Sequence, residues 1–68
     1  MQLAELLRKR RADQALTQEQ MAFRVGINRS LYTQIENGKK DISNKTIQKL
    51  AKTLKVEPSA IVEMIKGE

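Results

Sequence analysis

The sequence contains no cysteine, no histidine and no tryptophan among its 68 residues. Without cysteine there is no disulfide and no thiolate metal ligand, and without histidine the commonest general base and zinc ligand is missing. No apolar run approaches the roughly 18 residues of a membrane span, and the N-terminus lacks the apolar core of a signal peptide. We therefore expect a cytoplasmic protein with no membrane association and no metal.

Proline occurs once and glycine three times, and neither forms a glycine-rich loop of the kind that cradles phosphate groups. The carboxylates are not clustered, so no residues are available for general acid–base chemistry. We expect that the chain is not an enzyme, has no cofactor and has no small-molecule ligand.

Positive charge is in excess. The chain contains thirteen Lys and Arg residues and eight Asp and Glu residues, which gives a formal net charge of +5. An excess of this size on a small chain favours a polyanionic partner. Ordinary solubility is the alternative, and charge alone leaves the two open.

The spacing of apolar residues predicts an all-α fold. Strand-like alternation is absent, whereas apolar side chains recur every three or four residues, as on one face of a helix. A chain of this length forms one domain, residues 1–68. We expect five helices around one core, four of them at about 2–13, 18–25, 28–36 and 44–54 and a fifth that opens at Pro58.

Capping residues mark where the middle helices begin and end. Thr17 followed by Gln20 predicts a capping box at the start of the second helix. Gly26 ends that helix because glycine adopts a left-handed backbone at little cost. Asn28 caps the third helix, and the pair at 37–38 (Asn-Gly) stops it.

The segment from about 18 to 37 has the spacing of a helix-turn-helix motif. The small residue Ala22 lies four positions before the turn glycine Gly26, where the next helix must cross closely. Apolar residues surround these two, at Met21, Val25, Ile27, Tyr32 and Ile35.

The chain also resembles the Cro/C1-type family of phage and bacterial regulators over nearly its whole length. The residues that carry the resemblance are LTQEQMA at 16–22, VGINRS at 25–30 and IENG at 35–38. The resemblance implies a compact five-helix, lambda-repressor-like DNA-binding domain.

Four polar residues share the outer face of the third helix, because Tyr32 and Ile35 point inward: Arg29, Ser30, Thr33 and Gln34. The resemblance implies that this face enters the DNA major groove. Arg29 can bond the O6 and N7 of guanine, Gln34 can bond adenine, and the two hydroxyls can donate or accept. A solvated polar face is the alternative.

The resemblance also implies phosphate contacts on either side of this helix, by Gln18, Asn37, Lys39, Lys40 and Lys45. Gln18 begins the second helix, where free N–H groups favour an anion. Its family counterpart often also braces the first residues of the recognition helix. A solvated loop is the alternative for the residues around 37–45.

The resemblance further implies a structural ion pair between Arg11 and Glu36, which connects the first helix to the end of the third. Tyr32 stands where the family usually has a smaller aliphatic residue, so its hydroxyl needs a partner or a path to the surface; we expect a core ring with an exposed tip. Ala15 and Lys55 stand where glycine is frequent.

Two features suggest a partner chain. The last helix has more apolar surface than a terminal helix needs, and Ile61, Met64 and Ile65 are our candidates for a homodimer interface. Phe23 falls on the outer side of the second helix, which is a weaker indication of contact with a partner.

The resulting prediction is a homodimeric repressor that binds an inverted repeat in double-stranded DNA. Two alternatives remain open. An antitoxin uses the same motif to autoregulate its operon, and a protein-interaction module has the same scaffold without a DNA role.

Overall fold

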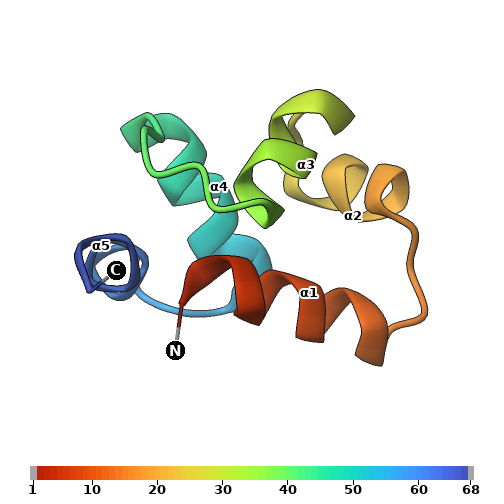
Figure 1. The fold of residues 1–68 in the computed structure, drawn as a ribbon, viewed down its shortest axis with the longest axis horizontal. Coiled ribbons are helices and arrows are strands. Elements are labelled where there is room, and N and C mark those ends of the chain that lie inside the picture. Colours follow the sequence, from red (N-terminus) through yellow and green to blue (C-terminus); the bar gives the residue numbers. More distant parts are fainter. Residues whose placement is uncertain (1, 68) are drawn as a thin grey trace.

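The computed structural model describes residues 2–67, which form five α-helices and their connections, with no strand in that range. The helices are α1 (Leu3–Asp13), α2 (Gln18–Val25), α3 (Arg29–Glu36), α4 (Asn44–Leu54) and α5 (Pro58–Lys66) (Figure 1). The predicted all-α class and the predicted five helices are confirmed, with boundaries within about one residue of those expected.

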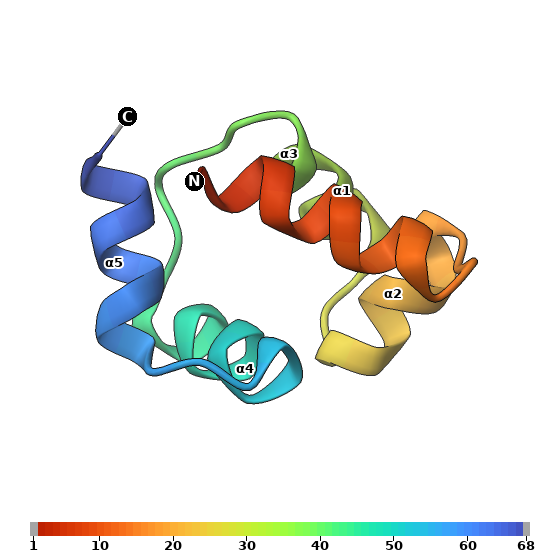
Figure 2. The ribbon, with the colours of Figure 1, turned by 90° about the horizontal axis from the view of Figure 1, so that it is seen from below.

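The five helices surround a single core. Helix α3 packs against α1 and α2, whereas α5 packs against α4 and the start of α1 (Figures 1 and 2). The largest fully buried side chains come from every helix: Leu7, Met21, Tyr32, Ile35, Leu50, Leu54, Ile61 and Glu36. Because each helix is too short to be stable alone, this shared burial holds α2 and α3 in place.

Side-chain caps fix the starts of the central helices. The Thr17 hydroxyl accepts a 3.1 Å bond from the Gln20 N–H, and the Gln20 side chain accepts a 2.9 Å bond from the Thr17 N–H. This is the predicted capping box. The Asn28 side chain likewise accepts a 2.7 Å bond from the Leu31 N–H at the start of α3.

The turn between α2 and α3 depends on Gly26. Its φ is +90°, and the N–H groups of Gly26 and Ile27 both bond to the carbonyl of Ala22, at 2.9 and 3.1 Å. A Cβ added to Gly26 would meet only the Lys49 Cδ, at 3.9 Å. Backbone conformation rather than lack of space therefore requires glycine at this turn.

Two other turns hold non-glycine residues in the left-handed region. Ala15, after α1, has φ +54° and Lys55, after α4, has φ +58°. These are the two positions at which the sequence departs from a frequent glycine. Each has a conformational cost of about 1 kcal/mol relative to a right-handed residue.

No helix within residues 2–67 is both long enough and apolar enough to cross a membrane.

Candidate nucleic-acid interface

The outer face of α3 is polar and open. Arg29, Ser30 and Gln34 are exposed, Thr33 is half-buried, and Tyr32 and Ile35 are buried on the opposite side. The burial pattern follows from the helical period, since positions 32 and 35 are three apart and share one face. The four residues predicted to contact bases therefore lie on one surface of a short helix; their contact with DNA stays a prediction.

Arg29 occupies the first position of α3. The positive end of the helix dipole lies there, so a cation at this place is unfavourable for the isolated helix. No ion pair or hydrogen bond within residues 2–67 engages the Arg29 side chain. Arg29 lines a shallow hollow together with Thr17 and Gln18, at the start of α2. Arg11 and Glu19 also line it, so an anion in this hollow would meet two guanidinium groups and a helix N-terminus but also one carboxylate.

The segment after α3 places further cations beside this face. Gly38, with φ +99°, ends α3, and the N–H of Lys39 bonds back to the Gln34 carbonyl at 3.0 Å. Asn37 and Lys40 are exposed and Lys39 is half-buried. Lys45 is exposed in the first turn of α4. Three of the four predicted phosphate contacts after α3 therefore lie in the connection to α4, and the fourth, Lys45, lies in the first turn of α4.

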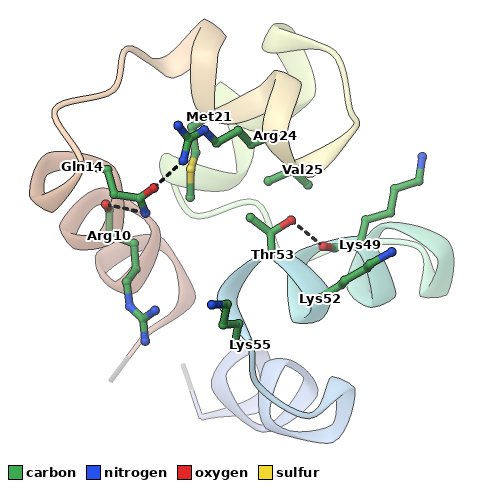
Figure 3. Close-up of a pocket in the computed structure, with 9 residues that line it drawn as sticks. All are labelled: Arg10, Gln14, Met21, Arg24, Val25, Lys49, Lys52, Thr53 and Lys55. Carbon is green, nitrogen blue, oxygen red and sulfur yellow. Dashed lines mark hydrogen bonds between the residues drawn. The ribbon is translucent and has the colours of Figure 1, made fainter.

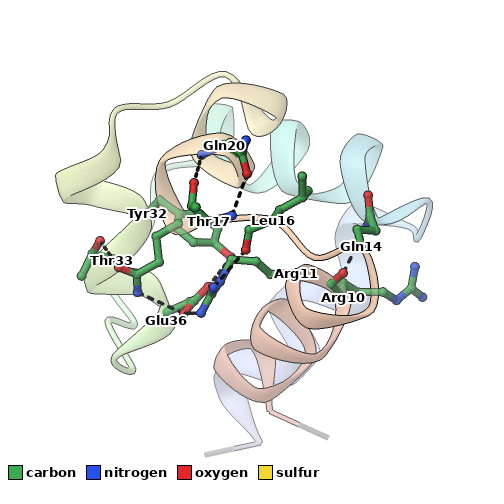
Figure 4. Close-up of polar contacts among 10 residues, drawn as sticks. Arg10, Arg11, Gln14, Leu16, Thr17, Gln20, Tyr32, Thr33 and Glu36 are labelled. Atoms are coloured by element: carbon green, nitrogen blue, oxygen red, sulfur yellow. Dashed lines mark hydrogen bonds and ion pairs between the residues drawn. The ribbon is translucent and has the colours of Figure 1, made fainter.

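The expected ion pair between Arg11 and Glu36 is present and connects α1 to the last residue of α3 (Figure 4). The Arg11 Nε donates to one carboxylate oxygen at 2.7 Å and Nη2 donates to the other at 3.2 Å. Nη1 donates to the Leu16 carbonyl at 3.1 Å. The Glu36 side chain is 2% exposed and that of Arg11 25%.

Three further side chains complete this network. The Tyr32 hydroxyl donates to the Glu36 carboxylate, and the Gln18 amide donates to the same carboxylate at 3.2 Å. The Thr33 hydroxyl donates to the Gln18 carbonyl oxygen at 3.4 Å. Gln18 therefore braces the middle and the end of α3, whereas the resemblance implied contact with the first residues of that helix.

The expected exposed tip of Tyr32 is wrong, because Tyr32 is fully buried. Its hydroxyl needs no path to water, because it donates a hydrogen bond to the Glu36 carboxylate one helical turn away. The spacing of four between Tyr32 and Glu36 was the available indication in the sequence, because residues four apart are neighbours on a helix.

The network perturbs the acidities of its members. Burial by itself would raise the pKa of Glu36, but hydrogen bonds from Arg11, Tyr32 and Gln18 outweigh it and lower this pKa. Burial raises the pKa of Tyr32, and the bond to Glu36 raises it further. The bond to Glu36 also raises the pKa of Arg11. Glu36 is therefore ionised at neutral pH and serves as a structural acceptor.

The three candidates for a dimer interface do not lie together on the surface. Ile61 is completely buried within its own chain, which corrects that assignment. It belongs to the core cluster and is the one fully buried residue of α5, whereas Val62, Met64 and Ile65 pack against the core only in part. Met64 and Ile65 are half-buried, so both still offer apolar surface to a partner.

Within residues 2–67 there is no group of three or more His, Cys, Asp or Glu side chains that could hold a metal ion.

A comparison with protein families matches the helix-turn-helix model over residues 7–61, which is most of the chain. No curated protein and no solved structure matches the chain. The matched region begins within α1 and ends within α5, so it includes the whole of α2, the turn and α3.

Proposed function

The chain belongs to the Cro/C1-type helix-turn-helix family of DNA-binding transcription regulators, and we propose that it is a homodimeric cytoplasmic repressor that recognises an inverted repeat. Helix α3 would lie in the major groove. The observation that carries the proposal is the open face of α3, on which Arg29, Ser30 and Gln34 are exposed.

Arg29 is the residue we assign to the most specific base contact. Its unpaired guanidinium at the start of α3 is unfavourable for stability, so its placement is explained by a ligand rather than by the fold. A guanidinium that meets guanine in the major groove discriminates among bases by about 1–3 kcal/mol. Thr33 can contribute only part of its surface, because it is half-buried and its hydroxyl donates a hydrogen bond to the Gln18 side-chain oxygen.

The phosphate contacts we propose are those of Gln18, Asn37, Lys39, Lys40 and Lys45. Gln18 is the first residue of α2, the residues at 37, 39 and 40 lie in the connection after α3, and Lys45 lies in the first turn of α4. Such contacts orient the protein on the duplex and make its affinity depend on salt, whereas base contacts determine the sequence.

The size of the domain supports the proposed dimer. The longest extent of the Cα trace is 27 Å. Half-sites on one face of B-DNA are about 34 Å apart, so one domain cannot contact both. We assign Met64 and Ile65 of α5 to the contact between two copies. A dimer over an inverted repeat would repress by excluding the polymerase.

The test is selection of bound duplexes from a random DNA library with purified protein. We expect enrichment of an inverted repeat with half-sites about 10 bp apart, centre to centre. Sedimentation of the bound complex should then give two chains per duplex. Binding without any enriched sequence would contradict base recognition by α3 and would favour the protein-interaction module. A single enriched half-site with one chain per duplex would contradict the dimer.

A further inference from the structure

A second charged surface is lined by none of the residues assigned above to DNA. A groove of about 710 Å³ runs between α1, α2 and α4 (Figure 3). Five cations line it and no carboxylate does: Arg10, Arg24, Lys49, Lys52 and Lys55. Met21 and Val25 contribute its apolar floor. The groove therefore has five cations, one more than the four cations assigned to DNA, which are Arg29, Lys39, Lys40 and Lys45.

None of these five cations has a carboxylate partner among residues 2–67. The Arg24 guanidinium instead donates to the Gln14 side chain at 2.7 Å, and the Lys49 ammonium donates to the Gly26 carbonyl at 3.1 Å. Arg10, Arg24 and Lys52 lie in the last turns of their helices, where a cation stabilises the helix dipole. That effect stabilises each helix separately and does not require the side chains to meet in one groove.

An exposed aromatic side chain adjoins the groove. Phe23 is 86% exposed. It lines a second, shallower hollow with Leu16, Glu19 and Gln20, and Arg24 lines both hollows. Glu19 is the one carboxylate of this hollow, so the apolar side chain of a partner rather than its acidic residues would lie there. Aromatic residues and arginine are both enriched in protein interfaces, so an exposed phenylalanine beside an arginine favours contact with another protein.

We propose that this surface, which we call the Arg24 surface, binds an acidic segment of another protein that carries an apolar side chain. It consists of the five groove cations together with Leu16 and Phe23. The acidic residues of the partner would lie along the cationic groove, and its apolar side chain would pack on Leu16 and Phe23.

The shape of the Arg24 surface favours a protein over other anions. A single nucleic-acid strand binds where successive aromatic side chains provide stacking platforms along a basic track. Here the floor is aliphatic and the one aromatic ring lies outside the groove. A free phosphate is held by helix N-termini, whereas the C-terminal halves of α1, α2 and α4 line this groove.

The experiment compares two variants of equal charge. The groove variant is R10Q/K52Q/K55Q, and its matched control is R8Q/K9Q/K66Q; each lowers the net charge from +5 to +2, because three cations are removed. All six side chains are exposed, so both variants should fold. Phe23→Ala removes the apolar contact without a change in charge, and thus tests the surface independently of the groove.

The probe is a random peptide library displayed on phage and selected on the wild-type chain. We expect enrichment of peptides that combine Asp or Glu with a Leu or Phe. The best peptide should bind the groove variant and Phe23→Ala at least about tenfold more weakly, and the control within about twofold of wild type. Amide shifts in an NMR titration with this peptide should map to α1, α2 and α4 around Arg24.

Three outcomes would overturn the proposal. One is the absence of acidic enrichment, and another is an equal loss of peptide binding in the groove variant and its control. The third is a single-stranded oligonucleotide, tested by fluorescence anisotropy, that loses affinity in the groove variant alone, because the surface would then bind nucleic acid. Operator binding by the groove variant should match that of the control, so failure of this proposal is separate from failure of the repressor assignment.

Discussion

At the scale of single residues, Arg29 carries the proposed sequence specificity. Replacing it with alanine should weaken binding to the selected operator by about 1–3 kcal/mol and should relax the preference at one base position. Binding to random DNA should change little, since phosphate contacts dominate it. The measurement is fluorescence anisotropy with operator and random duplexes at one salt concentration.

Arg8→Ala is the matched control, because Arg8 is an exposed arginine of α1 outside every site assigned here. Equal losses on operator and random DNA for Arg29→Ala would contradict base recognition by this residue and would leave it as a general phosphate contact.

Glu36 makes stability depend on pH. Its pKa is lower in the folded chain than its ordinary value of 4.5, so ionised Glu36 stabilises the fold above about pH 4.5. This contribution is lost as the pH falls through the lowered folded-state pKa. Glu36→Gln should decrease the free energy of unfolding by about 2 kcal/mol at neutral pH, because the bonds from Arg11 lose their charged acceptor.

The measurement is urea unfolding of wild type and variant between neutral and acidic pH. The difference between the two should shrink toward the acid end, where the wild-type carboxylate is protonated. Glu63→Gln, an exposed change in α5, should follow wild type at every pH. A constant difference across the whole range would contradict the assigned role of Glu36.

At the scale of the helices, the end of α1 contains avoidable backbone strain. Ala15 has φ +54°, so Ala15→Gly should raise the free energy of unfolding by roughly 0.5–1 kcal/mol. The same change at Ala12, which is exposed within α1, should lower it by a similar amount because glycine is unfavourable in a helix. Chemical unfolding of both variants is the measurement. Destabilisation by both changes would show that the turn does not strain Ala15.

The helix boundaries were predictable because they depend on local chemistry. Each cap or turn contact joins residues only a few positions apart, so the local sequence is enough to place α2 and α3. These contacts involve Thr17 with Gln20, Gly26 and Asn28. The environment of Tyr32 was less predictable. Its hydroxyl contacts Glu36, whose other hydrogen-bond donors, Arg11 and Gln18, come from other helices.

At the scale of the whole molecule, the cations beside α3 should determine how binding responds to salt. Lys39→Ala should weaken binding to every duplex alike and should lower the slope of log affinity against log salt by about one. Lys66→Ala, at the end of α5, removes the same charge from a helix without a proposed phosphate contact. It should therefore leave the slope unchanged. A titration of both variants from low to moderate salt makes the comparison. Equal slopes for the two would contradict the phosphate contact of Lys39.

The sequence by itself determined the five helices, the turn at Gly26 and the polar face of α3, because helical period, caps and glycine conformation act over short distances along the chain. Only the tertiary structure decided that Ile61 lies in the core, that Gln18 and Tyr32 join the Arg11–Glu36 pair, and that five scattered cations meet in one groove. These features depend on which helices pack together, since residues far apart in the chain become neighbours only when α1, α2 and α4 close around a common core.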